Sequence, residues 1–92
     1  MYEYNVYIPS LETCIYMQEG DGSQLDAIDY ANGLDGYIDY EIQSGKNAGD
    51  GGIFMFNVEQ NKNDDWRNLI PEAIKFALDL DECPEYELKE VA

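Results

Sequence analysis

The chain contains no Lys or Arg before Lys46, and this one-sided charge constrains its folding more than any other feature. All charged side chains of residues 1–45 are carboxylates. The whole chain has 20 acidic residues against 5 basic ones and no His, for a net charge of −15. Self-repulsion on this scale opposes a compact state. A domain of 92 residues has little stability to spare. The acidity is easier to explain if it attracts a basic partner, or occupies a surface that normally receives nucleic acid.

The composition nevertheless predicts a folded chain. Hydrophobic residues make up 45% of the sequence and aromatic residues 13%, with only 3 prolines, which argues against disorder. The apolar residues also fall into periodic runs, and no internal repeat or linker interrupts them. We therefore expect one globular domain over residues 1–92. An ordinary acidic or salt-adapted protein would share this composition, so charge alone does not identify a function.

Several classes of protein are disfavoured by what the sequence lacks. The N-terminus has no basic region followed by an apolar stretch, and no apolar run approaches the ~20 residues of a membrane span, so we expect a cytoplasmic protein. Cys14 and Cys83 are far apart and no His is present, which makes a zinc site improbable. We expect no metal and no cofactor. Direct binding of nucleic acid is excluded by the sign of the charge.

Period-2 and helical patterns predict an α+β domain. Residues 2–8 alternate as a half-buried strand, and residues 11–18 can form a second strand or an irregular edge. Ser23 opens a helix in the style of a capping box, which continues to Ala31 and stops at Gly33.

The second half repeats this order. Residues 37–43 alternate, the glycine-rich stretch 44–52 predicts a hairpin connection, and the apolar run 53–58 predicts a central strand antiparallel to 37–43. A second helix follows a cap within 63–65, and Pro71 implies either a late start or a kink. The tail 85–91 predicts a short edge strand. The order is therefore β-β-α-β-β-α-β, a two-layer domain with a sheet of 4-5 antiparallel strands packed by two helices.

Catalysis has little support in the sequence. Without His, acid–base chemistry would fall to carboxylates, Tyr, Lys or Cys, and paired acids are too common here to mark a site. Each Cys lies in an acidic neighbourhood, which raises rather than lowers a thiol pKa. We expect no enzyme and assign no catalytic residues.

The acids instead suggest a surface for a basic partner. Asp39 and Glu41 lie two apart on a strand, so they project from one face roughly 6–7 Å apart, with Tyr37 beside them. Acids also occupy locally unfavourable places, such as i,i+3 neighbours on the first helix and the C-terminal end of the second. We expect the contact surface to comprise Asp26, Asp29, Asp35, Tyr37, Asp39 and Glu41, with Asp79, Asp81 and Glu82 as a second patch.

In size and charge the chain resembles small acidic inhibitors of phages and mobile elements, namely anti-CRISPR proteins, antirestriction proteins and uracil-glycosylase inhibitors. Two short stretches, Val6 to Leu11 and Tyr37 to Glu41, are also similar to the ArdA antirestriction family. The resemblance implies a DNA mimic of phage origin that acts in the host cytoplasm. No residue roles are carried over from that family.

The leading hypothesis is thus a non-enzymatic inhibitor that binds the nucleic-acid-binding surface of a defence or DNA/RNA-processing complex. An immunity protein or antitoxin that neutralises a basic nuclease toxin is the alternative, since it would use the same electrostatics. The expected partner is a basic nucleic-acid-binding protein or ribonucleoprotein complex, and no membrane is involved. Self-association through an exposed sheet edge, as a homodimer, stays open.

Overall fold

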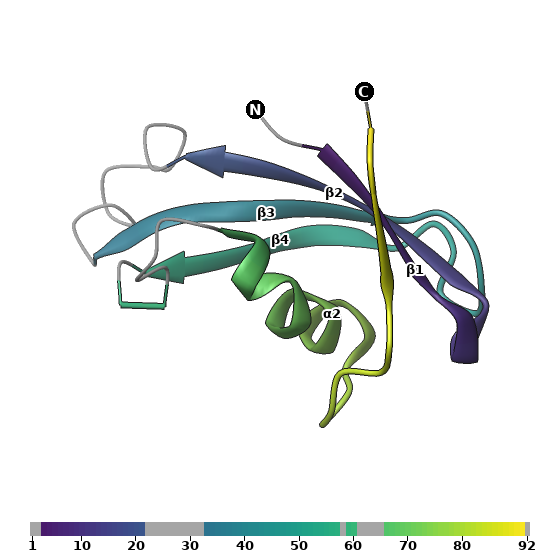
Figure 1. Ribbon diagram of the computed structural model, residues 1–92. Coiled ribbons are helices and arrows are strands. Elements are labelled where there is room, and N and C mark those ends of the chain that lie inside the picture. The colour runs from purple at the N-terminus through teal and green to yellow at the C-terminus, as the bar shows by residue number, and fades with distance from the viewer. Residues whose placement is uncertain (1–2, 22–32, 58, 61–65, 92) are drawn as a thin grey trace.

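The computed structural model describes residues 3–21, 33–57, 59–60 and 66–91. These form a 5-stranded antiparallel sheet in the order β4-β3-β2-β1-β5, with an α-helix on one of its faces (Figure 1). The strands are β1 (Glu3–Ile8), β2 (Thr13–Asp21), β3 (Leu34–Ile42), β4 (Gly51–Asn57) and β5 (Glu87–Glu90). The helical elements are two short 3-10 turns, η1 (Pro9–Leu11) and η3 (Trp66–Leu69), and one α-helix, α2 (Ile70–Leu78).

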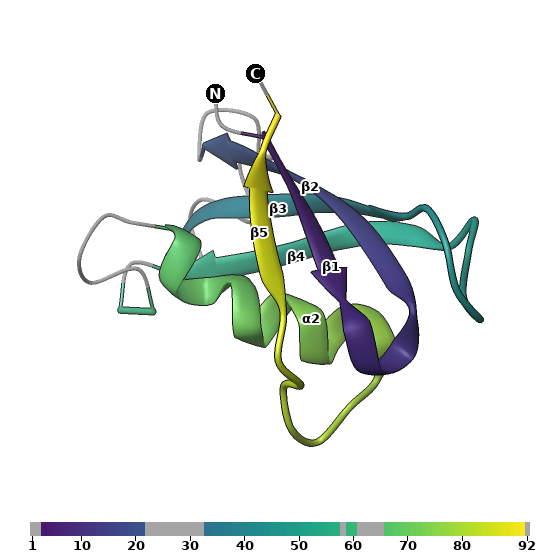
Figure 2. The same ribbon diagram turned by 45° about the vertical axis from the view of Figure 1, so that its right-hand side comes forward.

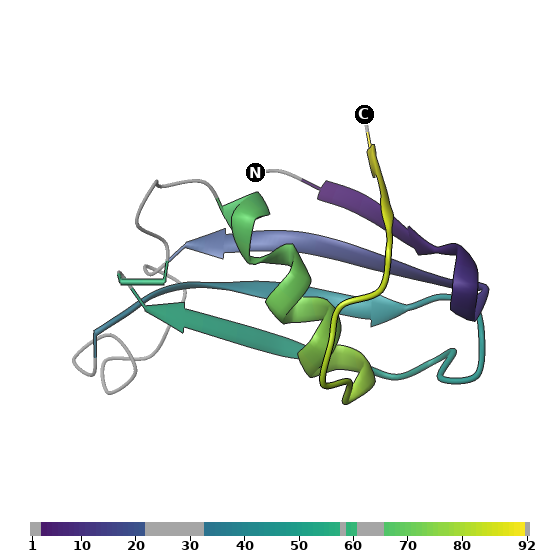
Figure 3. The ribbon, with the colours of Figure 1, turned by 60° about the horizontal axis from the view of Figure 1, so that its bottom comes forward.

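The alternating strands bury one side of the sheet against α2, which lies diagonally across them (Figure 3). Ile15, Met17 and Ile38 are fully buried on this side, opposite Ile70 and Ile74 of the helix. The rings of Tyr4 and Trp66 pack with their centroids 5.5 Å apart. The complete core consists of Tyr4, Val6, Ile8, Ile15, Met17, Ile38, Ile42, Phe56, Trp66, Leu69, Ile70, Ala73 and Ile74.

Pro71 explains how the helix begins. A proline has no backbone N–H and is tolerated in the first turn of an α-helix, where that group has no intrahelical acceptor. Pro71 lies in the first turn of α2, and the preceding residues form the 3-10 turn η3. The late start is therefore confirmed, and the kink is not observed.

The prediction of a sheet packed by two helices is wrong. In the described part of the chain the helical layer consists of α2 and the short η3 that leads into it, and the fold is mostly sheet. The other predicted helix, Ser23 to Ala31, lies outside the described residues. Its prediction rested on a capping pattern and three apolar positions, which is weak support, because helices in proteins are stabilised mainly by packing.

The position of the fourth strand also differs from expectation. The run 53–58 was expected at the centre of the sheet, whereas β4 is an edge strand that pairs with β3. Ile53 is 49% exposed and Met55 44%, so only alternate residues of the apolar run are covered by the helix. The antiparallel pairing of β4 with β3 and the edge position of β5 are as predicted, and β5 lies beside β1 (Figure 2).

Candidate partner-binding face

The side of the sheet opposite α2 is not covered by any described helix or strand (Figures 1 and 3). We call it the open face. Its side chains are those that alternate with the core positions along each strand: Glu3, Asn5, Tyr7, Cys14, Tyr16, Gln18, Tyr37, Asp39, Glu41, Ile53, Met55, Glu87 and Lys89.

Strand register brings acids from different parts of the chain together on this face. Glu3 lies opposite Gln18, which lies opposite Asp39. In the neighbouring row Tyr16 lies between Asn5 and Glu41. Strands are about 4.8 Å apart, so adjacent members of a row are close neighbours. Asp39 and Glu41 are exposed, and each is available to a partner.

The pKa of Tyr16 is raised by the carboxylates of the open face. The Glu3 carboxylate accepts a hydrogen bond from the Tyr16 hydroxyl and raises the pKa of the phenol, with smaller contributions from partial burial and from the charge of Asp39. All of these causes favour the protonated phenol. The Tyr16 hydroxyl is thus influenced by carboxylates from two other strands, Glu3 of β1 and Asp39 of β3.

Tyr37 has a structural task in addition to its place among the acids. Its ring lies over Gly20 of the neighbouring strand, where a Cβ would collide with the ring atoms. Gly20 is buried although it has no side chain, because the aromatic ring covers it. The ring lies over the backbone of β2, and Tyr37 neighbours Asp39 on its own strand and Met55 on β4.

The structure brings together only part of the predicted contact surface. Tyr37, Asp39 and Glu41 lie on the open face as predicted. Asp26 and Asp29 lie outside the described residues. Asp35 belongs to β3 at a register irregularity between Leu34 and Gly36, and only its backbone is described.

The second predicted patch is separate from the first. Asp79, Asp81 and Glu82 are exposed at the C-terminal end of α2 and in the turn after it, on the helix side of the sheet (Figure 1). Because the sheet separates these acids from the open face, one flat partner surface does not reach both patches. We call residues 79, 81 and 82 the helix-end patch.

The sequence prediction missed Glu3, Tyr16 and Glu87 as members of the open face. The alternation of residues 2–8 already placed Glu3 opposite the core side of its strand. Tyr16 alternates with buried Ile15 and Met17, which was a usable signal of the same kind. Glu87 depends on the pairing of β5 with β1, which residue spacing alone does not reveal.

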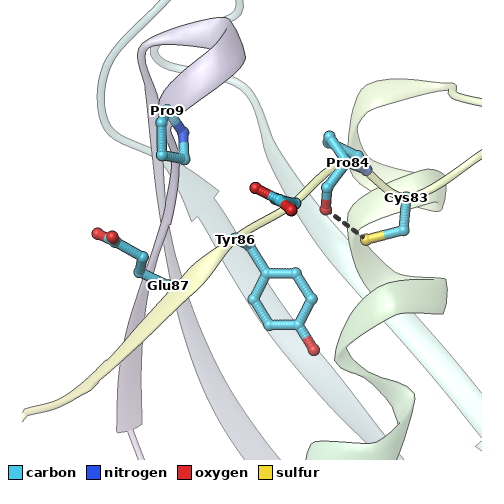
Figure 4. A pocket seen from close by; sticks show the side chains of 6 residues that line it. Pro9, Cys83, Pro84, Tyr86 and Glu87 are labelled. Atoms are coloured by element: carbon cyan, nitrogen blue, oxygen red, sulfur yellow. Dashed lines mark hydrogen bonds between the residues drawn. The ribbon is translucent and has the colours of Figure 1, made fainter.

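A separate open hollow of about 470 Å³ lies where the chain leaves α2 and enters β5 (Figure 4). It is lined by Pro9, Cys83, Pro84, Glu85, Tyr86 and Glu87. The Cys83 thiol donates to the carbonyl oxygen of Pro84 over 3.3 Å. Burial raises the pKa of Cys83, and the nearby Lys75 only partly opposes this, so the thiol stays protonated and weakly nucleophilic at neutral pH.

Tyr86 is equally unsuited to act as a base in this hollow. Burial raises the pKa of its phenol, and Cys83 adds to the shift. Among the described residues, no three His, Cys, Asp or Glu side chains are grouped so that they could hold a metal ion, and Cys14 and Cys83 form no disulfide. Neither Cys83 nor Tyr86 is therefore activated as a nucleophile or base in this hollow.

Comparison with protein-family models, with curated proteins and with solved structures finds no match to this chain. In the described part of the chain, no helix is long and apolar enough to cross a membrane.

Proposed function

We propose that this chain is a non-enzymatic inhibitor that docks its open face on the nucleic-acid-binding surface of a basic protein or ribonucleoprotein complex, in the manner of anti-CRISPR and other DNA-mimicking proteins. One observation carries the proposal: the sheet register gathers Glu3, Asp39, Glu41 and Glu87 from three strands on a face that no described element covers. Lys and Arg that normally hold phosphates would meet carboxylates there.

The sheet suits this task because it holds its charges at fixed spacing. Side chains on strands lose less freedom on binding than side chains on loops, so the cost of ordering them is small. Tyr7, Tyr16 and Tyr37 lie among the acids, and aromatic faces bind guanidinium groups through cation–π contacts. Lys89 is the cation of this face and lies opposite Asn5 at its β5 margin, away from Asp39 and Glu41.

Charge steering follows from the same arrangement. A protein of net charge −15 attracts a basic surface from a distance, and the association slows as salt screens the field. We place the action in the host cytoplasm, where such complexes work.

The test is capture of partners from a bacterial lysate on the immobilised chain, repeated with excess duplex DNA as a competitor. We expect recovery of a nucleic-acid-binding complex that duplex DNA displaces. Recovery of a single nuclease toxin would favour the immunity-protein alternative. Capture of nothing at low salt, or of proteins that DNA does not displace, would contradict the proposal.

A further inference from the structure

The outer edge of β4 differs from every other strand edge in the described structure. β4 pairs with β3 on one side, and its other side has no strand partner among the described residues. Its seven residues, Gly51 to Asn57, include no charged side chain and no proline, whereas β1, β2, β3 and β5 all contain acids. Edge strands usually carry charges, prolines or bulges that prevent pairing with another chain.

The opposite edge of the sheet is guarded in this way. β5 consists of Glu87, Leu88, Lys89 and Glu90, all exposed. Three of these four side chains are charged, and a short, charged strand resists pairing with another chain. The molecule thus blocks self-pairing at one edge and leaves it open at the other.

The backbone of β4 has its hydrogen-bonding groups in the right phase for pairing. Ile42 N–H donates to the carbonyl oxygen of Asp50 over 2.8 Å, which sets the alternation along the β3–β4 ladder. Phe54, four residues beyond Asp50, therefore faces β3, while the N–H and C=O groups of Ile53 and Met55 point outward. In agreement, the outward-facing N–H of Asn57 donates to the side-chain oxygen of Gln60 over 3.0 Å, so this donor is already occupied at that end of the edge.

Apolar side chains flank the open edge on both sides of the sheet. Ile53 is 49% exposed and Met55 44% on the open face. On the helix side the ring of Phe54 packs on Phe76, with centroids 5.6 Å apart, and Phe76 is 56% exposed. An edge that is apolar on both faces and lacks charge is complementary to a second apolar strand.

We propose that β4 pairs with β4 of a second copy of this chain, antiparallel about a two-fold axis at Phe54. Ile53 then lies opposite Met55 of the second copy, and Phe54 lies opposite its own equivalent. Over residues 51–57 no ionised side chain opposes another. A second copy fits this edge because the strip is complementary to itself and carries no charge, so the repulsion between two chains of net charge −15 is weakest there.

The proposal goes beyond the proposed function and is independent of it, because the pairing leaves Asp39 and Glu41 of both copies uncovered. The two contacts also respond oppositely to salt. Screening reduces repulsion between the acidic copies and strengthens the dimer, whereas it weakens the attraction of the open face for a basic partner. A single strand pair buries less than a standard interface, so we expect dissociation in roughly the micromolar range or weaker.

The experiment measures the average mass of the chain by sedimentation over a range of concentrations, at low and at moderate salt. We expect a monomer–dimer equilibrium that shifts toward dimer with salt. Met55→Glu should weaken the dimer by at least about tenfold, since it places a carboxylate beside the second copy. Leu11→Glu is the matched control, because Leu11 is also 44% exposed and lies in η1, away from this edge.

Amide hydrogen exchange gives a second readout that does not depend on a variant. Exchange at Ile53 and Met55 should slow as protein concentration rises, while exchange at Phe54 should not change, because its N–H already faces β3. A monomer at every concentration would overturn the proposal. So would a dimer that Met55→Glu and Leu11→Glu affect equally, or concentration-independent exchange at Ile53 and Met55.

Discussion

At the scale of single residues, Asp79 occupies an unfavourable backbone position at the end of α2. It ends α2 in the left-handed conformation, with φ 54° and ψ 53°, and its backbone N–H donates to the carbonyl oxygen of Lys75. Glycine adopts this conformation without steric cost, and a carboxylate also opposes the negative C-terminal end of the helix. We expect Asp79→Gly to stabilise the fold by about 0.5–1 kcal/mol, a rise of roughly 2–8 °C in melting temperature.

The matched control is Asp81→Gly, which removes the same charge from an exposed residue beyond the helix. Of the described non-glycine residues, only Glu12 and Asp79 have positive φ, so Asp81→Gly relieves no strain and should not stabilise the chain. Equal melting temperatures for the two variants would contradict the account of Asp79. Thermal unfolding followed by circular dichroism is sufficient.

Ionisation of Tyr40 is expected to destabilise the fold at alkaline pH. Burial raises the pKa of its phenol above the usual value near 10, and Asp50 adds to the shift. The folded state therefore holds this proton more tightly than the unfolded state, so the resulting stability is present below pH 10 and is lost as pH rises through the folded pKa. We expect the melting temperature of Tyr40→Phe to fall less than that of the wild type when the pH is raised from about 9 to about 11.

Tyr7→Phe is the control for this measurement, because Tyr7 is an exposed tyrosine of the open face. It should reproduce the wild-type loss. If Tyr40→Phe and Tyr7→Phe followed the same curve as the wild type, ionisation of Tyr40 would not contribute to alkaline unfolding.

At the scale of elements, the junction of β2 and β3 depends on Gly36. A Cβ at this position would lie 2.7 Å from the carbonyl oxygen of Gly20 and 3.0 Å from the ring of Phe56. The carbonyl oxygen belongs to the backbone and the ring is buried in the core, so neither yields easily. We expect Gly36→Ala to destabilise the fold by about 1–3 kcal/mol, measured by urea unfolding.

Gly20→Ala is the comparison, since the new methyl group would meet the Tyr37 ring, which can rotate away into solvent. We expect it to cost less than Gly36→Ala. A Gly36→Ala protein as stable as the wild type would show that the two strands separate more easily than the structure indicates.

The elements also show which parts of the fold the sequence could predict. Alternation identified β1 and β3 because one side of each strand is buried under α2, as for Ile38 and Ile42. The same rule failed for β4, where a continuous apolar run suggested a central strand. Which edge a strand occupies depends on pairing between distant segments, and local periodicity does not contain that information.

The candidate site divides in the same way. Tyr37, Asp39 and Glu41 could be predicted as one face because they belong to one strand. Glu3 and Glu87 join them only through the pairing of β1 with β2 and with β5. The helix-end patch was predicted from its unfavourable charges, and sequence could not reveal that the sheet separates it from the open face.

At the scale of the whole molecule, one sheet separates three surfaces, of which two are acidic and one is neutral. The open face is acidic and aromatic, the helix-end patch is acidic, and the outer edge of β4 is neutral and apolar. Under the two proposals made above, this division would let one small chain attract a basic partner on one face and pair with a second copy along one edge. The net charge of −15 is thus organised rather than spread uniformly.

The central claim is that the open face, and not the total charge, binds the partner. The most direct test compares the affinity of two double variants for the captured complex: Asp39→Lys with Glu41→Lys on the open face, and Asp81→Lys with Glu82→Lys on the helix-end patch. Both change the net charge equally, and all four positions are exposed, so both variants should fold.

We expect the open-face variant to bind at least about tenfold more weakly than the helix-end variant, because reversed charges would then lie against the basic surface of the partner. Equal losses in the two variants would mean that only the total charge matters. A larger loss in the helix-end variant would place the contact on the other side of the sheet and contradict the account.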